Sequence, residues 1–309
     1  MPLRYTLRQL EYFVAVGETG SIAAASQQVN VSSPSISAGI SQLEEELGLR
    51  LFVRHHAQGL TPTLPGRRML DHAQKVLRQA AGLRDLASEL SGAVGGPLAI
   101  GCLSTFAQIV LPGLRRDFVA RYPEVRSTQV EADQAEIFGL LRQAKIDLAL
   151  TYDLDLPGDL RFFPMLELPP LVAMSVDHPL AHLPEVPVQE LAPHPMVLLD
   201  LPLSADYFLS FFSKAGLRAN IAERTRDMAV MRSLVANGFG YSIVNVRPLH
   251  DRAPDGKPMR FAPLTGKPHP LKMGLLSGLG TDRTQLHQAF IAHSRDWMAR
   301  HGATLIGGR

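Results

Sequence analysis

Small hydroxyl side chains form two clusters whose spacing could support binding chemistry. The members are Ser32, Ser33, Ser35 and Ser37 around Pro34 in the first cluster, and Ser104 and Thr105 in the second. A hydroxyl both donates and accepts hydrogen bonds, so such clusters can bind phosphate, a base edge or a carboxylate. The sequence therefore predicts two binding sites, and the elements around each cluster decide what it binds.

The second cluster lies between a predicted strand, Leu98–Leu103, and a predicted helix, Phe106–Tyr122. In an open α/β lobe, ligands bind beyond the carboxyl ends of strands, where helix N-termini present free amides. We expect Ser104 and Thr105 to cap that helix and to donate their hydroxyls to a bound carboxylate. Capping alone is the other interpretation. The turn Gly238-Phe239-Gly240 also has two interpretations. It either lets the backbone approach a ligand-binding cleft closely or serves as an ordinary turn.

Cys102 is the only cysteine, so no intrachain disulfide can form, which fits a reducing cytoplasm. A thiol near a helix N-terminus can act as a redox sensor. However, no second cysteine could resolve an oxidised thiol, and a lone cysteine at a strand end is more often a small buried apolar residue. The N-terminus lacks the apolar run of a secretory signal peptide, so the expected location is the cytoplasm.

Signatures of enzymes and metal sites are missing from the sequence. It contains no GxSxG, GxxxxGK[ST], HExxH or GxGxxG pattern. His178 and His182 are four residues apart, but Pro179 breaks the helix that would align them as zinc ligands. We therefore expect no catalytic residue, no metal and no cofactor.

The first cluster begins a helix that follows another helix after a tight turn. Ser21 caps a helix that ends at Asn30, and Ser32 or Ser33 caps the next one, which has Pro34 in its first turn. Two short helices joined in this way are the helix-turn-helix pattern, whose second helix reads the DNA major groove. The serines and Pro34 are thus predicted DNA contacts. The alternative is a solvated helix face.

A wing follows, in which Arg54, His55 and His56 precede a glycine turn at Gly59. These side chains could contact phosphate, although adjacent histidines on a loop are often only exposed polar residues. Residues 1–62 hold four arginines against five glutamates, a net charge of −1, in a chain whose overall charge is +2. Such a balance predicts DNA affinity that depends weakly on salt.

Apolar residues then recur at steps of four and three over one long helix. They form a heptad seam of Met69, Ala73, Val76, Ala80, Leu83, Ala87 and Leu90. Three such heptads favour a two-helix coiled-coil contact between copies of the chain. The alternative is packing against the chain's own body.

Glycines from Gly92 to Gly96 and Pro97 end that helix, and alternating strand and helix patterns follow to about His301. The alternation predicts parallel sheets with helical crossovers, and its restart after Phe162–Pro164 predicts two lobes. The last helix, about Gln285–His301, is expected to return to the first lobe, as in the periplasmic binding proteins.

These motifs together closely resemble the LysR-type transcriptional regulators. The resemblance is carried by Leu7-Arg8-Gln9-Leu10-Glu11-Tyr12-Phe13, Val31-Ser32-Ser33-Pro34-Ser35-Ile36-Ser37, Gln42-Leu43-Glu44-Glu45-Glu46-Leu47-Gly48 and Leu51-Phe52-Val53-Arg54. It covers about the first 90 residues strongly and the rest by layout. At Ala38 and Gly39 the family usually has longer polar or basic residues, so this recognition helix offers no cation to phosphate or guanine.

The resemblance implies an α/β fold class with an N-terminal all-α winged helix-turn-helix, a long linker helix and a two-lobed effector domain like the periplasmic binding proteins. The expected domains are the winged helix-turn-helix at 1–62, the linker and dimerisation helix at 63–92 and the effector domain at 93–309. Lobe I comprises about 93–164 and 270–309, and lobe II about 165–269.

By position, the resemblance also implies that the effector cleft is lined by the segment around Cys102, Ser104 and Thr105, by Thr151 and Tyr152, and by Pro202, Leu203 and Ser204, with Phe239 at a nearby turn. The implied partners are double-stranded DNA, a small-molecule effector such as a carboxylate, other copies in a dimer or tetramer, and RNA polymerase, with no membrane. The alternative function is a solute-binding module with a helical dimeriser and no specific DNA recognition.

Overall fold

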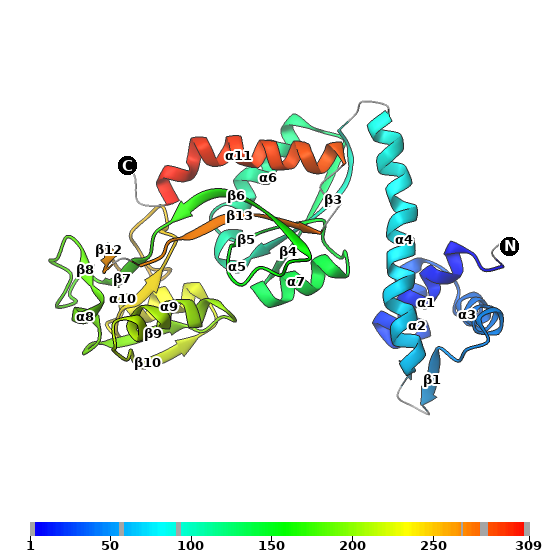
Figure 1. The fold of residues 1–309 in the computed structure, drawn as a ribbon, viewed down its shortest axis with the longest axis horizontal. Coiled ribbons are helices and arrows are strands. Elements are labelled where there is room, and N and C mark those ends of the chain that lie inside the picture. The colour runs from blue at the N-terminus through cyan, green and yellow to red at the C-terminus, as the bar shows by residue number, and fades with distance from the viewer. Residues whose placement is uncertain (1–3, 56–58, 91–93, 267, 279–283, 306–309) are drawn as a thin grey trace. The chain divides into compact units, whose positions relative to one another are not determined.

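The computed structural model describes residues 4–55, 59–90, 94–266, 268–278 and 284–305. The chain divides into two compact units, residues 1–91 and 92–309, and each is described by itself. The first unit is built from helices and one hairpin, and the second from two α/β lobes (Figure 1).

The first unit starts with three helices, each begun by a side-chain cap. They are α1 (Leu7–Thr19), α2 (Ile22–Val29) and α3 (Ser33–Leu47), capped by Thr6, Ser21 and Ser32 respectively. Each cap oxygen accepts a hydrogen bond from an amide of the first turn that has no partner inside the helix. Gly20, Asn30 and Gly48 then end the three helices with left-handed backbone (φ 66°, 53° and 63°), a conformation that glycine and asparagine adopt at low cost.

A β-hairpin and a long helix complete this unit. The hairpin pairs β1 (Phe52–His55) with β2 (Gly59–Pro62), and α4 (Leu64–Leu90) follows it. The helices pack around fully buried Phe13, Val16 and Ile36, to which the start of α4 adds Ala73. The winged helix-turn-helix architecture predicted from the sequence is therefore present, and α4 belongs to the same compact unit.

Lobe I of the second unit is a five-stranded sheet in the order β4-β3-β5-β13-β6. Its strands are β3 (Gly96–Leu103), β4 (Val125–Ala132), β5 (Leu148–Tyr152), β6 (Leu160–Leu168) and β13 (Leu271–Gly278). The helices of this lobe are α5 (Ser104–Ala107), α6 (Leu111–Arg121), α7 (Gln134–Arg142) and α11 (Gln285–Leu305). The helix α11, red in Figure 1, packs its apolar face into this lobe's core through residues such as Phe290 and Trp297.

Lobe II holds a four-stranded sheet in the order β11-β7-β12-β8 and a parallel pair, β9 and β10. Its strands are β7 (Leu171–Ser175), β8 (Val186–Pro187), β9 (Pro195–Leu199), β10 (Asn220–Thr225), β11 (Ser242–Val244) and β12 (Met259–Thr265). Its helices are α8 (Val188–Leu191), α9 (Ser204–Lys214) and α10 (Met228–Ala236). Apolar clusters on both sides of β7 and β9 form its core.

The chain passes between the lobes twice, after β6 and before β13. This gives the two-lobed arrangement expected from the sequence. Lobe I is nevertheless not purely parallel, because β13 pairs antiparallel with both β5 and β6. A strand that returns from the other lobe need not follow the crossover rule that makes consecutive βαβ strands parallel.

One predicted helix is two helices in the structure. The expected Phe106–Tyr122 helix is divided into α5 and α6 by residues 108–110, and Pro112 lies in the first turn of α6, where a missing amide hydrogen costs nothing. The expected side-chain caps are also wrong, because the N-cap residue of α5 is Leu103, and no side chain makes a capping hydrogen bond there.

Over the described residues, no helix combines the length and apolar character needed to cross a membrane. The same part of the chain contains no cluster of three or more histidine, cysteine or acidic side chains placed to share a metal ion.

Candidate functional site

The recognition helix α3 exposes small polar side chains at its N-terminus. Ser32 caps the helix, and its hydroxyl oxygen lies 2.8 Å from that of Ser35. Ser32, Pro34 and Ser35 are exposed, whereas Ser33 and Ser37 are half-buried. Hydroxyls on an accessible N-terminal turn suit contacts with phosphate or base edges.

Ala38 and Gly39, the two positions at which the sequence departs from the family pattern, differ in burial. Ala38 is exposed on the same face as Ser35, but Gly39 is buried. A Cβ at Gly39 would lie 2.8 Å from Cδ2 of Tyr12 on α1, so glycine there permits close packing of α3 on α1. Gly39 therefore serves the packing of α3 on α1, and of the two positions only Ala38 leaves a short side chain on the exposed face of α3.

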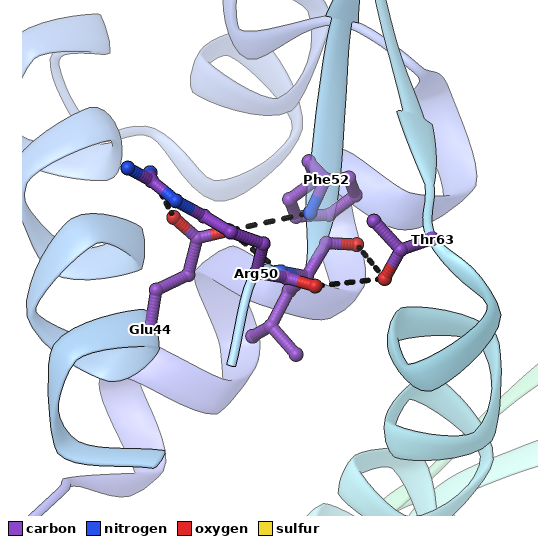
Figure 2. A network of polar contacts seen from close by, with 5 residues as sticks. Glu44, Arg50, Phe52 and Thr63 are labelled. Atoms are coloured by element: carbon purple, nitrogen blue, oxygen red, sulfur yellow. Dashed lines mark hydrogen bonds and ion pairs between the residues drawn. The ribbon is translucent and has the colours of Figure 1, made fainter. Parts of the chain in front are cut away.

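Glu44 links the recognition helix to the wing, as Figure 2 shows. Its Oε1 accepts hydrogen bonds from the amides of Leu51 (2.7 Å) and Phe52 (3.2 Å), and its Oε2 lies 3.3 Å from Nη1 of Arg50. The Glu44 side chain is only 11% exposed, while that of Arg50 is 87% exposed. The Glu44 carboxylate of α3 thus binds the backbone at the start of β1 and is largely withdrawn from solvent.

Thr63 joins the other end of the wing to α4. Its hydroxyl donates to the carbonyl oxygen of Arg50 at 2.8 Å (Figure 2). The same hydroxyl accepts from the amide of Gly66 (2.9 Å) in the first turn of α4. The hairpin is held against α1 as well, because the amide of Leu60 donates to the carbonyl oxygen of Gly20 (2.8 Å). A Cβ at Gly59 would lie 2.5 Å from that same oxygen, which explains the glycine. Sequence reasoning identified neither Glu44 nor Thr63.

The predicted wing contacts fall partly outside the structural description. Arg54 and His55 contribute backbone to β1, but their side chains, like the whole of His56, lie outside the described residues. Phosphate contact by these three residues stays a prediction. Among the described residues, Arg8, Arg67 and Arg68 are exposed cations of this unit.

The cleft between the two lobes of the second unit contains a cavity. Its lining residues are Leu103, Thr105, Asp133, Gln134, Tyr152, Leu199, Leu201, Pro202, Ser204, Phe208, Met228, Val244, Asn245 and Val246. The lining comes from the ends of β3, β5, β9 and β11 and from the starts of α7, α9 and α10. Strand ends and helix N-termini therefore meet there, as the general rule for α/β ligand sites predicts.

Gln134 is a lining residue whose amide is fully engaged. Its Nε2 donates to the carbonyl oxygens of Tyr152 (3.1 Å) and Leu154 (2.7 Å), and its Oε1 accepts from the hydroxyl of Thr151 (3.0 Å). Burial raises the pKa of the Tyr152 phenol far above its usual value, so that phenol is neutral. These groups give the lobe I wall of the cavity a fixed polar frame.

Asn245 lies where the chain leaves β11. Its Nδ2 donates to the carbonyl oxygen of Leu168 (2.8 Å) and to the hydroxyl of Tyr207 (3.2 Å). Tyr207 in turn donates to the carbonyl oxygen of His269 (2.6 Å). These bonds tie together both segments that cross between the lobes and the helix α9 that borders the cavity.

The chain enters α9 through a strained turn at Leu203. Leu203 has φ 65° and ψ −42°, and the amide of Ser204 donates to the carbonyl oxygen of Pro202 at 2.8 Å. This is a γ-turn with a left-handed central residue, a rare and strained conformation outside glycine. Leu203 also packs against the core of lobe I, so the strained residue joins the two lobes.

Of the predicted effector contacts, Thr105, Tyr152, Pro202 and Ser204 line the cavity. The other five do not, and the reasons differ. Cys102 is 0% exposed in the core of lobe I, Ser104 is exposed outside the lining, and the Thr151 hydroxyl is used by Gln134.

Leu203 and Phe239 are the remaining two predicted contacts that do not line the cavity. Leu203 turns toward the core of lobe I, and Phe239 borders a separate apolar groove on lobe II with Val230 and Leu234. Asp133, Gln134, Asn245 and most of the apolar lining were missed, because they come from elements that are distant in sequence. The only sequence signal that could have indicated one of these residues is the start of the helix at Gln134.

The redox interpretation of Cys102 is not supported by its surroundings. Burial, with a further contribution from the negative charge of Glu131, raises the pKa of the thiol well above its ordinary value. A buried, protonated thiol is a poor nucleophile. Cys102 therefore behaves as a small apolar core residue.

The heptad seam on α4 divides into two parts. Ala73 is buried and Met69 half-buried against the core of the first unit, so these two residues pack on the chain's own body rather than on a partner. Further along, Ala80 is half-buried, whereas Val76 (40% exposed) and Leu83 (68% exposed) are open. The side chains of Ala87 and Leu90 lie outside the described residues. The predicted dimer contact therefore depends on the later part of the helix.

Comparison with known proteins identifies the family of both units. Residues 7–67 match the family model for bacterial regulatory helix-turn-helix proteins of the lysR family, and residues 91–299 match the LysR substrate binding domain. The regulator CysB of Haemophilus influenzae is 30% identical over 243 residues, which cover 77% of this chain and 75% of CysB. The DNA-binding transcriptional dual regulator OxyR of Escherichia coli is 30% identical over 242 residues, covering 77% and 78%.

A solved structure is similar over almost the whole chain. HinK, a LysR family transcriptional regulator from Pseudomonas aeruginosa, has 32% identity and a TM-score of 0.63, covering 94% of this chain and 98% of HinK. The matched relatives are named as regulators, and the alternative of a solute-binding module without specific DNA recognition is not favoured. This chain belongs to the LysR family of DNA-binding transcriptional regulators and carries the effector-binding domain of that family.

Proposed function

We propose that this regulator binds a roughly palindromic DNA site as a dimer and is switched by a small molecule bound between the lobes of its effector domain. The observation that carries the proposal is the cavity between the lobes, lined from both sides and containing polar groups of the strand ends. Lobe-to-lobe contacts would build a tetramer, RNA polymerase would be a further partner, and the site of action would be the cytoplasm. We assign the protein no catalytic role, since its matched relatives are named regulators.

The cavity supports a switch because it is nearly closed. It leaves about 20 Å³ for the centre of a water molecule, which is room for one or two waters. An effector of metabolite size must therefore widen the cleft, and its free energy of binding will differ between the closed and the opened lobes. Only such a difference in affinity can shift a conformational equilibrium.

The DNA half of the proposal rests on the exposed N-terminal turn of α3 and on the rigid link from Glu44 to the wing. The link holds the recognition helix and the hairpin as one body, so both can be presented to one stretch of duplex. A dimer presents two such bodies and favours two half-sites in opposite orientation.

The test is a fluorescence-anisotropy titration of the full chain against the DNA immediately upstream of its own coding region, with random duplex as competitor. We expect binding at least about a thousandfold tighter than to random duplex. Equal weak binding to both duplexes would contradict a sequence-specific regulator. The titration is repeated with Ser35→Ala, and Ser91→Ala, outside the recognition helix, serves as the control.

A further inference from the structure

The cavity between the lobes contains two buried polar atoms without a hydrogen-bond partner. They are Oδ1 of Asn245 and Oγ1 of Thr105, and the two residues are 2% and 6% exposed. The Thr105 hydroxyl interacts with the phenol of Tyr152 without reaching good hydrogen-bond geometry, so Oδ1 of Asn245 is the clearer case. Both residues line the cavity. Leaving such a group unpaired is costly, so an unsatisfied pair in one cavity indicates what an occupant would supply.

The orientation of the Asn245 amide decides its chemistry. One side of the amide faces the carbonyl oxygen of Leu168, which can only accept a hydrogen bond. The nitrogen must therefore occupy that side, and the oxygen is the atom left over. Asn245 consequently offers the cavity an acceptor, and its ideal partner is a hydrogen-bond donor.

The charge of the lining residues also disfavours an anionic occupant. The lining includes one ionisable carboxylate, Asp133, and no lysine, arginine or histidine is among the described residues that border the cavity. Oδ1 of Asp133 accepts from the amide of Glu136 (3.0 Å), and Oδ2 accepts from Nη2 of Arg226 (3.2 Å). The Arg226 side chain is 69% exposed, so it lies mainly in solvent. A second anion in the cavity would lie beside Asp133 without a desolvated cation to compensate it.

Several amide donors at the cavity are already used. Gln134 gives both hydrogens of its amide to backbone carbonyl oxygens. At the start of α9, the amides of Ser204, Ala205 and Tyr207 donate to the carbonyl oxygens of Pro202, Leu201 and Leu203. An anionic ligand would thus find hydroxyl groups but no cation in the lining, whereas the walls formed by Leu199, Leu201, Phe208, Met228 and Val244 suit an apolar body.

We infer that the effector is a small, largely apolar molecule that donates hydrogen bonds and has no negative charge, such as an alcohol, an amide or an amine. The inference rests on the proposed effector-binding function, and it replaces the carboxylate expected from the sequence. The donor binds Oδ1 of Asn245, the Thr105 hydroxyl completes the polar contact, and the apolar part of the effector lies against the lobe II wall.

The experiment compares three probes with one ring and different polar groups, namely benzyl alcohol, benzamide and benzoate. Thermal unfolding of the full chain is followed with each probe at one shared concentration. For benzyl alcohol and benzamide, we expect the midpoint of the effector-domain transition to rise by roughly 2–4 °C at several times the dissociation constant. We expect no rise with benzoate. An equal or larger rise with benzoate, or no rise with any probe, would overturn the inference.

Two valine substitutions assign the effect to the cavity. Thr105→Val removes an unsatisfied hydroxyl, so the unliganded midpoint should not fall, while the rise with benzyl alcohol should be reduced and then restored in Thr105→Ser. The matched control is Thr151→Val, which removes the donor to Gln134 and should lower the unliganded midpoint. If Thr105→Val lowers the midpoint as much as Thr151→Val does, the hydroxyl is already satisfied and the inference is wrong.

The inference about the effector and the proposed regulator function can be contradicted independently of each other. The titration with upstream DNA needs none of these probes, so a wrong choice of effector class leaves specific DNA binding unchanged. If benzoate stabilises the parent protein and Arg226→Gln abolishes that effect, an anion binds through Arg226 and the assignment of a donor is overturned. Loss of specific DNA binding with an intact response to benzyl alcohol would instead contradict the regulator proposal alone.

Discussion

Glu44 illustrates, at the residue scale, how a charge that looks unfavourable in the sequence can act within the fold. In the sequence it is one of three consecutive glutamates on a helix predicted to meet DNA. In the structure its two oxygens bind the Leu51 and Phe52 amides and the Arg50 guanidinium. The nearby residues Glu45 and Glu46 are exposed. The acidic run is therefore less harmful to DNA binding than the count of charges suggests.

Glu44→Ala is expected to loosen the wing. Hydrogen bonds to a charged group contribute about 1.5–3 kcal/mol, so hydrogen exchange of the Leu51 and Phe52 amides should accelerate by roughly ten- to a hundredfold. Glu45→Ala, which removes an exposed carboxylate of the same helix, should leave both amides unchanged. Equal protection in the two variants would show that the Glu44 bonds do not hold the hairpin.

Cys102 is expected to be unreactive in the folded protein. The thiol is fully buried and its pKa is raised, so both access and thiolate population oppose reaction. Iodoacetamide should modify Cys102 only after denaturation, as measured by intact mass. Rapid modification of the native chain, or a peroxide-induced change in DNA affinity that Cys102→Ser removes, would restore the redox hypothesis.

His178 predicts a pH dependence of stability. Its burial, reinforced by the neighbouring His194, lowers the pKa of His178, and its Nδ1 accepts from the amide of Leu180 (3.2 Å) only when the ring is neutral. A histidine with a lowered folded-state pKa contributes stability above its unfolded pKa of about 6.5, and this is lost as the pH falls toward the folded pKa.

Thermal unfolding of the full chain from about pH 7.5 to about pH 5.5 measures this contribution. His178→Asn keeps an acceptor for the Leu180 amide but does not titrate, so the midpoint should fall less on acidification than in the parent. The exposed His182 lies on the same turn, and His182→Asn is the matched control. Identical pH profiles for His178→Asn and the parent would exclude this role.

At the scale of elements, α4 serves two purposes along its length. Its first turns complete the core of the first unit through Met69, Leu70 and Ala73, and its later part leaves Val76 and Leu83 exposed. Large apolar side chains that stay open on a helix of 27 residues are typical of a contact with another copy. The predicted heptad seam is thus shortened at its N-terminal end but is still the best candidate for a dimer contact.

Leu83→Asp is expected to weaken or abolish the dimer, because a buried unpaired carboxylate in a coiled-coil contact is strongly unfavourable. Sedimentation velocity of the full chain measures the association state. Lys75→Asp introduces the same side chain at an exposed position outside the seam and should leave the association unchanged. A dimer that survives Leu83→Asp would place the contact elsewhere.

At the scale of the whole molecule, charge sets how the regulator meets DNA. The chain has an overall charge of +2, and residues 1–62 have a net charge of −1. Exposed Arg8, Arg67 and Arg68 supply cations from helices other than α3. Binding to the duplex would therefore depend on the shape of the winged helix-turn-helix and on hydroxyl contacts more than on the release of counterions.

The dependence of DNA affinity on salt measures this balance. The slope of log K against log salt concentration should be well short of about −10, the value that roughly ten phosphate contacts produce. Anisotropy titrations at several salt concentrations give the slope, and Arg67→Gln tests whether one exposed arginine contributes to it. A slope close to −10 would refute the prediction.

Several features follow from the sequence because they depend on neighbours along the chain. Capping residues such as Ser21 and Ser32 place helix starts, and apolar periodicity places the helices that follow. Strand and helix alternation after Gly96 predicts the two-lobed fold, and the dense motif from Leu7 to Arg54 predicts the family. Thr105, Tyr152, Pro202 and Ser204 were predicted because they lie at strand ends or helix starts.

Other features depend on contacts between residues that are far apart in sequence. Three contacts form only after the chain has folded: Glu44 binds the amide of Leu51, Gly39 packs on Tyr12, and Asn245 donates to the carbonyl oxygen of Leu168. The direction of β13, the division between α5 and α6 and the burial of Cys102 were likewise decided by packing. The sequence by itself determined the family, the two-lobed plan and several strand-end positions of the cleft, since local physics encodes them. Only the tertiary structure decided which polar groups remain unpaired in the cavity, because hydrogen-bond satisfaction depends on every neighbour at once.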